Sequence, residues 1–242
     1  MRREICILDI PKTGNVTVNI ERKNISSCRL KLFPSQKIKL SVPNETPSGW
    51  IENYLKNKKD WIIKKLENFE KTKGYEATVV INNGISIRLL GQDMIFSIYK
   101  SEKKRVTFEY RSIYIGLPNI SDSKETEHLF DKWWRKQAFS VYSEVLDTLY
   151  PIVEKHNINK PNLKIRKMKT LWGSSSPHKG IITLNFYLLK AKKPCIEYVI
   201  LHELTHTLFP HHDRQFFDFL TLYMPDWKDR KNILDTEVVQ GL

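Results

Sequence analysis

A His-Glu-Leu-Thr-His segment beginning at His202 constrains the fold of this 242-residue chain more than any other feature. Pro194 and Pro210 bracket an apolar run around it, a pattern typical of one helix that starts near the first proline and ends before the second. The spacing of four puts His202 and His206 one turn apart on the same helix face. Glu203 projects about 100° further around the axis. The chain must therefore fold around a helix that presents two imidazoles and a carboxylate to one site.

Two imidazoles at this spacing can bind a single Zn²⁺ ion. A zinc ion with three protein ligands keeps a position for water and lowers the pKa of that water to about 7. Glu203 is placed to take the proton and later pass it to a leaving amine. A third neutral ligand is needed, and of His211 and His212 we favour His212, six residues after His206. We expect a zinc-dependent peptidase that hydrolyses peptide bonds through zinc-bound water activated by Glu203, with His202, His206 and His212 as ligands.

The remaining pattern predicts an α+β protein with two domains. Residues 1–120 alternate apolar and polar side chains as half-buried strands do, around a helical insertion at residues 50–69. Apolar residues at helical spacing over 129–149 predict a long helix that follows a Ser-Asp-Ser cap cluster. We place the domain boundary within residues 116–123, between a strand-rich N-terminal domain and a catalytic domain at 121–242. No internal repeat is evident.

Within the second domain, the sequence predicts a small antiparallel sheet. Residues 163–168 and 180–186 have strand patterns, and the Gly, Ser and Pro content of residues 172–177 indicates a turn between them. We expect the helix with the two histidines to pack on this sheet.

The charge of the chain is strongly basic and unevenly distributed. The net charge is +13, of which residues 1–120 carry +10. Residues 155–196, which precede the histidine helix, contain ten Lys or Arg and no Asp or Glu. Such a run is usually a solvated face, and it can alternatively hold nucleic acid near the site. No recognised DNA-binding motif accompanies it.

Composition excludes several other classes of protein. A hydrophobic fraction of 40% with 6 Trp supplies a core, which argues against disorder. No apolar run approaches the roughly 20 residues that a membrane-spanning helix needs, and we expect neither a signal peptide nor a membrane partner. Cys6, Cys28 and Cys195 are too few and too far apart for a disulfide framework, which favours a reduced, cytoplasmic setting.

Two other functions fit part of the pattern. Some metal-dependent nucleases use three histidines at offsets of zero, four and ten, although Glu203 at the second motif position is the peptidase feature. A basic nucleic-acid-binding module with a structural zinc is the other alternative. It would need a closed site with four protein ligands, and the sequence offers no convincing fourth.

The motifs of the second half resemble those of a known family. The His-Glu-Leu-Thr-His segment and residues 212–217 (HDRQFF) resemble the zinc-binding block of YgjP-like metallopeptidases, relatives of the SprT-like and WLM zinc proteases. Residues 169–176 (KTLWGSSS) and 180–185 (GIITLN) resemble the Trp-Gly-Ser signature of the family and the strand that follows it. Residues 223–228 (YMPDWK) match its tail pattern. The likeness is weaker in the first half.

The resemblance implies a compact, zincin-like α+β catalytic domain with the same three histidine ligands and Glu203 as the base. It also implies a peptide or protein substrate, paired in extended form with an edge strand near residues 180–185. The residues of that strand expected to contact substrate are Gly180, Ile181, Ile182 and Thr183. SprT-like and WLM relatives act on proteins attached to DNA, which adds a precedent for nucleic acid near residues 155–196.

Four further residues have less defined roles. Asp213 is a candidate hydrogen-bond partner for a ligand imidazole, and a helix N-cap is an equal alternative. Tyr223 is a candidate oxyanion group, with packing as the commoner role of such an aromatic residue. Ser175 stands where the family often has Cys, and Leu171 where it often has a basic residue, so the sequence assigns no role to either.

Overall fold

The computed structural model describes residues 2–10, 14–32, 37–71, 81–168 and 171–235. Over this part of the chain the fold is mixed α+β, with three sheets and several helices. Contacts between residues divide the chain into two compact units, Met1–Tyr75 and Glu76–Leu242. None of the described helices is long and apolar enough to cross a membrane.

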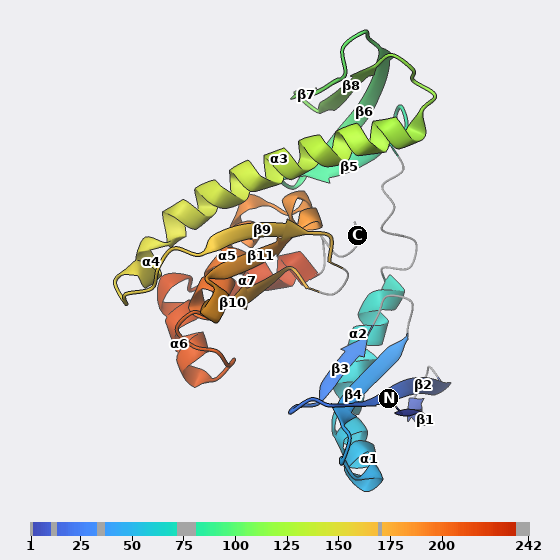
Figure 1. Cartoon of the computed structure of the whole chain (residues 1–242), viewed down its shortest axis with the longest axis vertical. Helices are drawn as coiled ribbons and strands as arrows, with labels where there is room; N and C mark the ends of the chain where they lie inside the picture. The colour runs from blue at the N-terminus through green and yellow to red at the C-terminus, as the bar shows by residue number, and fades with distance from the viewer. Residues whose placement is uncertain (1, 11–13, 33–36, 72–80, 169–170, 236–242) are drawn as a thin grey trace. The chain divides into compact units, whose positions relative to one another are not determined.

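The unit Met1–Tyr75 is a four-stranded sheet followed by two helices (Figure 1). The strands lie in the order β1-β2-β4-β3, with β1–β2 and β3–β4 antiparallel and β2–β4 parallel. The helices occupy the block where the sequence predicts a helical insertion. The elements are β1 (Arg2–Ile10), β2 (Gly14–Lys23), β3 (Arg29–Leu32), β4 (Ile38–Pro43), α1 (Ser48–Asn57) and α2 (Lys59–Lys71).

The unit Glu76–Leu242 begins with a second four-stranded sheet of the same topology. The strand order is β5-β6-β8-β7, again with antiparallel outer pairs and a parallel central pair. The two sheets are thus a structural repeat, although no repeat is evident in the sequence. These strands are β5 (Ser86–Leu89), β6 (Gln92–Lys100), β7 (Arg105–Glu109) and β8 (Ser112–Leu117).

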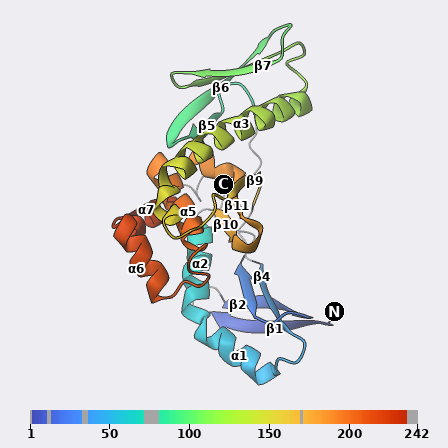
Figure 2. The ribbon, with the colours of Figure 1, turned by 60° about the vertical axis from the view of Figure 1, so that its left-hand side comes forward.

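A long helix, α3 (Ser123–Leu149), connects the second sheet to the rest of its unit, and the short α4 (Pro151–Glu154) follows it. Asp122 caps α3 by accepting a hydrogen bond from the Glu125 backbone N–H at 2.9 Å. In both views β6, β7 and β8 lie on one side of α3, and α5 (Lys193–Thr205) with the strands that follow α4 lies on the other (Figures 1 and 2). All of these elements share one hydrophobic core.

The shared core corrects the expected domain boundary. Residues 116–123 join β8 to α3 inside a single core, and the chain divides between Tyr75 and Glu76 instead. The change from strand pattern to helix cap near residue 120 marks the start of a helix. A change of local pattern does not reveal whether the two elements pack together, because packing depends on residues far apart in the sequence.

The third sheet consists of β9 (Asn162–Arg166), β10 (Gly173–Ser176) and β11 (Ile181–Asn185), in the order β10-β11-β9. A 3₁₀ turn, η1 (Pro177–Lys179), joins β10 to β11 as an antiparallel pair, whereas β9 and β11 are parallel. The two strands that the sequence predicts correspond to β9 and β11, and these are parallel, so the prediction of an antiparallel sheet is wrong for that pair. The antiparallel pair includes β10, which the sequence did not predict.

The strand β10 occupies the stretch where the sequence predicts a turn. Gly and Ser are poor strand formers by themselves, and strand formation depends strongly on the neighbouring strand. Here Ser174 pairs with Thr183, and Ser175 pairs with Ile182. Pairing with β11 thus overrides the local turn composition.

The chain ends with a second 3₁₀ segment, η2 (Phe186–Lys190), and the helices α5 (Lys193–Thr205), α6 (Arg214–Tyr223) and α7 (Trp227–Ile233). Pro194 lies in the first turn of α5, where its missing N–H costs no helical hydrogen bond. Helix α5 contacts α3, α6, α7, β10 and β11. It is therefore largely buried, which is why most of its sides are apolar.

Candidate metal and catalytic site

Three histidines converge at the C-terminal end of α5. His202 lies in the last turn of α5, His206 is the C-cap residue that follows this helix, and His212 comes from the turn that precedes α6. One ring nitrogen from each lies within 4.8 Å of the others, and the Nε2 atoms of His202 and His212 are 3.0 Å apart. Tetrahedral zinc with Zn–N bonds of about 2.0–2.1 Å brings its nitrogen ligands to about 3.3 Å from one another. The donor set therefore fits one such ion.

A backbone carbonyl orients one of these rings. The Nδ1 of His206 lies 3.1 Å from the carbonyl oxygen of Phe209. Because a carbonyl oxygen only accepts, we assign the proton to Nδ1, which leaves the Nε2 lone pair for a metal. Ligand histidines in proteins are commonly held in this way.

Phe216 of α6 packs against all three imidazoles, a role that the sequence analysis did not assign. Its ring centroid lies 4.9 Å from that of His202, 4.7 Å from His206 and 4.8 Å from His212, and its side chain is fully buried. The HDRQFF motif was the available signal, since it contains this residue. Phe216 thus forms an apolar wall behind the donor atoms.

This environment favours neutral imidazoles. Burial lowers the pKa of His202 to about 3, and the adjacent His206 and His212 contribute in the same direction. Burial also lowers the pKa of His206 and of His212. The Nδ1 of His202 is buried without a hydrogen-bond partner in the described part of the chain. Neutral imidazole is the form that binds a metal.

Glu203 is buried beside the strand β10. Its side chain is 5% exposed, and an added Cβ at Gly173 would lie 2.7 Å from both its Cγ and its Oε1. Only glycine therefore fits at position 173 without displacing the carboxylate. Burial raises the pKa of Glu203 to about 8, and a hydrogen bond from the Ser175 backbone N–H lowers it in part. A nearby cation would also favour the ionised carboxylate.

Among the described strands, β10 has a neighbour on one side only and is the edge strand beside Glu203, which corrects the expected location of the edge. Ile181, Ile182 and Thr183 belong to the central strand β11, which pairs with β10 on one side and β9 on the other. Gly180 precedes the strand, with a φ of 57° at the end of η1. Alternating side chains suit central and edge strands alike, so the sequence pattern could not show which strand is outermost.

Asp213 caps a helix. Its side chain accepts a hydrogen bond from the Phe216 backbone N–H at 3.0 Å, at the N-terminus of α6. This bond corresponds to the N-cap alternative, and it places His212 at the entrance of the helix.

Tyr223 lies at the opposite end of α6. A ten-residue helix spans about 15 Å, and the described ring and hydroxyl contacts of Tyr223 are with Phe219 and Lys155, not with the three histidines. Lys155 donates a hydrogen bond to this hydroxyl, and its Nζ lies 4.5 Å from the ring centroid. The structure therefore does not bring Tyr223 into the site.

The two positions that depart from the family pattern lie on either side of Gly173. Leu171 is 55% exposed, and its carbonyl oxygen accepts a hydrogen bond from the Asn185 side-chain amide at 2.8 Å. Ser175 is partly buried, and its Oγ has no hydrogen-bond partner among the described residues. Its backbone N–H donates a hydrogen bond to the Glu203 side chain.

The basic run at residues 155–196 is partly neutralised by α3. Three of its lysines form ion pairs with acidic side chains of that helix: Lys160 with Asp147, Lys167 with Asp131, and Lys193 with Glu144. Another, Lys190, is buried. A run without acids in the sequence thus meets acids in the fold at three of its ten basic residues.

Comparison with known proteins agrees with the family suggested by the motifs. The family model described as YgjP-like, metallopeptidase domain, matches residues 26–237. The chain therefore belongs to the YgjP-like metallopeptidase family. Membership implies a hydrolase that acts on a peptide or protein and uses a divalent metal, typically zinc.

Solved structures with some similarity are also metallopeptidases. The metallopeptidase zymogen of Pyrococcus abyssi abylysin is 21% identical, with 40% of this chain and 93% of that chain covered and a TM-score of 0.37. The metallopeptidase zymogen of Methanocaldococcus jannaschii jannalysin is 25% identical, with 41% and 94% covered and a TM-score of 0.33. No curated protein matches the chain.

Proposed function

We propose that this protein is a zinc-dependent peptidase of the HExxH type, with a zincin-like catalytic domain. His202, His206 and His212 hold the metal, and Glu203 is the catalytic base. The observation that carries the proposal is the convergence of three imidazole nitrogens within 4.8 Å of one another, together with a buried carboxylate, Glu203, next to His202 in α5.

Zinc bound to these histidines would supply a Lewis acid for the substrate carbonyl and a water molecule of lowered pKa. A carboxylate oxygen of Glu203 accepts a proton from the attacking water and then delivers it to the nitrogen of the leaving amine. The hydrogen bond from the Ser175 backbone N–H holds the Glu203 side chain in place. The carboxylate is buried beside Gly173 of β10, and exclusion of bulk water there strengthens its electrostatic interactions.

The edge of β10 is the proposed binding place for an extended substrate. Gly173–Ser176 pairs with β11 on one side only, and the same strand contacts Glu203. A peptide that adds to a free strand edge is held by main-chain hydrogen bonds, which places successive peptide groups in register. This arrangement would bring a substrate carbonyl next to the base.

The direct test is Glu203→Gln. We expect about one zinc per chain by metal analysis in the wild type and in the variant. Cleavage of a denatured protein substrate should fall by about 10²- to 10⁴-fold, because the amide cannot accept the proton. Glu127→Gln, an exposed change on α3, is the matched control and should keep full activity. Wild-type rates in Glu203→Gln would refute the mechanism.

A further inference from the structure

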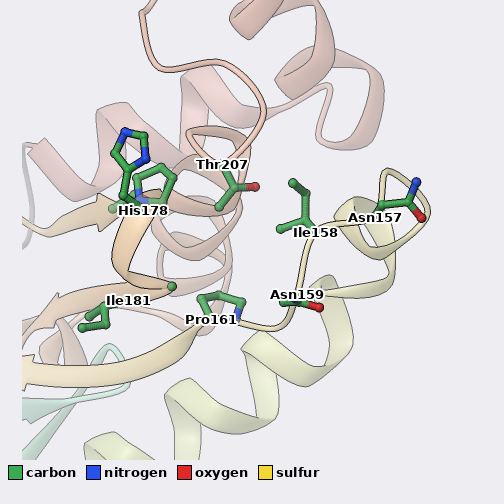
Figure 3. Close-up of a pocket in the computed structure, with 10 residues that line it drawn as sticks. Asn157, Ile158, Asn159, Pro161, His178, Ile181 and Thr207 are labelled. Atoms are coloured by element: carbon green, nitrogen blue, oxygen red, sulfur yellow. The ribbon is translucent and has the colours of Figure 1, made fainter.

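Two surface features lie outside the three-histidine cluster. One is a pocket of 310 Å³ near η1, around which Figure 3 shows Thr207, Ile158, Pro161 and Ile181. Its described lining contains no Asp, Glu, Lys or Arg, so no charge there favours one class of ligand over another. The other feature is the strand β1 of the unit Met1–Tyr75, and its side chains do point to a partner.

β1 presents two exposed isoleucines at the edge of its sheet. Among the described strands, this nine-residue strand pairs with β2 alone. Ile5 is 70% exposed and Ile7 is 65% exposed, and alternation along the strand puts both on one face of the sheet. Their cross-strand neighbours on β2 are the polar Asn19 and Thr17. A long edge strand with apolar side chains is a template for pairing with another strand.

The opposite edge of the same sheet is protected. β3 has only four residues, and Arg29 and Lys31 are exposed there. Lys31 lies in the same row across the sheet as Ile5, through Lys39 and Asn19. Short length and charged side chains are the usual protection of an edge strand against association. One edge of the sheet therefore has this protection, and the β1 edge has isoleucine in its place.

The order of residues along β1 fits a second copy of the same strand. Positions 3, 5, 7 and 9 are Arg, Ile, Ile and Asp. In an antiparallel pair centred on Cys6, Ile5 of one copy lies opposite Ile7 of the other. In the same register, Arg3 of each copy lies opposite Asp9 of the other. Apolar pairs and pairs of opposite charge stabilise antiparallel strands, whereas like charges directly opposite destabilise them.

We propose that two copies of this protein associate through β1, antiparallel about Cys6, so that their β1–β4 sheets join into one. The contact is isologous, because a two-fold axis at Cys6 gives both copies the same neighbours. It covers both exposed isoleucines of each copy. Because one strand per copy takes part, the dimer should be reversible and dependent on concentration. The interface lies in Met1–Tyr75 and does not depend on the proposed peptidase chemistry.

Sedimentation velocity of the full chain, from low to high micromolar concentration, measures the association. We expect the mass to rise from one chain of 28.6 kDa toward two. Ile5→Thr and Ile7→Thr keep a β-branched side chain and remove apolar surface, so each should weaken the dimer by about tenfold. Ile95→Thr is the matched control, since Ile95 is 48% exposed on β6, an inner strand of the other four-stranded sheet.

Two outcomes of this measurement would overturn the proposal. One is a monomer at every concentration. The other is a dimer that Ile5→Thr and Ile7→Thr weaken no more than Ile95→Thr does, since the copies would then associate through another surface. Circular dichroism of each variant verifies that it folds.

Charge reversal tests the register separately. Arg3→Glu places an acid opposite Asp9 of the second copy, and Asp9→Arg places a base opposite its Arg3. Each variant alone should therefore dimerise about tenfold more weakly than the wild type. An equimolar mixture of the two variants should associate as tightly as the wild type, because each of these pairs then joins opposite charges. Damage to folding cannot produce such a rescue, and a mixture no tighter than its components would overturn the antiparallel register.

Discussion

The two four-stranded sheets share a topology but differ in what packs against them. Sheets β1–β4 and β5–β8 have the same strand order and the same pairing directions. The first is followed by the helix pair α1 and α2, and its unit closes there. The second packs on α3, which continues into the core that supports the three histidines. The shared sheet topology therefore does not determine where the histidine site lies. The helix that packs against the second sheet does.

The cores of the two units also differ in the types of side chain that they bury. The buried core of Met1–Tyr75 is aliphatic at every described position, as at Val18, Leu40 and Leu55. The larger core of Glu76–Leu242 includes buried aromatic side chains with polar ends. On α3, Trp134 donates to the Phe186 carbonyl oxygen at 2.9 Å, and Tyr142 donates to the Asn185 carbonyl oxygen at 3.1 Å. These bonds fix α3 to the end of β11, whereas aliphatic packing alone specifies orientation less strictly.

The largest expected effect is a core truncation in each unit. Trp134→Ala should lower the free energy of unfolding of Glu76–Leu242 by about 3–5 kcal/mol, because it leaves a cavity and an unpaired carbonyl. Leu55→Ala should cost Met1–Tyr75 about 2–5 kcal/mol and leave zinc affinity unchanged. Denaturant unfolding and zinc titration measure both effects. A loss of zinc affinity in Leu55→Ala would show that the two units are energetically coupled.

Zinc itself should stabilise one unit and not the other. At free zinc about 100 times its Kd, the free energy of unfolding of Glu76–Leu242 should rise by about 2.7 kcal/mol. Hydrogen exchange, followed by mass spectrometry with and without a chelator, should slow in α5 and α6 and stay constant in β1–β4. A zinc-dependent slowing of exchange in β1–β4 as large as that in α5 and α6 would contradict this prediction.

A buried amide distinguishes the second unit further. Asn185 is 1% exposed, and its side-chain N–H groups donate to the carbonyl oxygens of Met168 and Leu171, both at 2.8 Å. Asn185→Ala should cost about 1–3 kcal/mol in thermal unfolding, because these carbonyls lose their partner. Asn162→Ala, an exposed change on β9, is the matched control. Equal melting temperatures in the two variants would show that the amide is not structural.

The smallest expected effect concerns helix ends. The α1 helix of the first unit has no side-chain N-cap, whereas Asp213 caps α6. Asp213→Ala should cost about 1 kcal/mol, and Asp213→Asn should cost only a few tenths because it keeps the cap. Both variants should retain zinc affinity within about twofold. A tenfold loss of affinity in Asp213→Asn would reveal a carboxylate role at the metal instead.

Predictions from local spacing agree with the structure better than predictions about which distant segments pair or pack together. The long helix before Pro151, the histidine helix and the turn that delivers His212 all follow from local spacing and capping rules. The strand at Gly173–Ser176 could not be predicted, because its partner β11 decides its conformation. The ion pairs between Lys160, Lys167 or Lys193 and α3 join residues far apart in the sequence.

The sequence by itself indicated the family and the proposed donor set. Helical geometry places residues four apart on one face in any fold, so His202 and His206 lie together wherever the helix lies, whereas the fold brings His212 to them. Only the tertiary structure decided which of the described strands is an edge strand beside Glu203, that Gly173 makes room for Glu203, and that the Ser175 backbone bonds to it. These features depend on pairing and packing between distant segments, and such contacts leave no local pattern in the sequence.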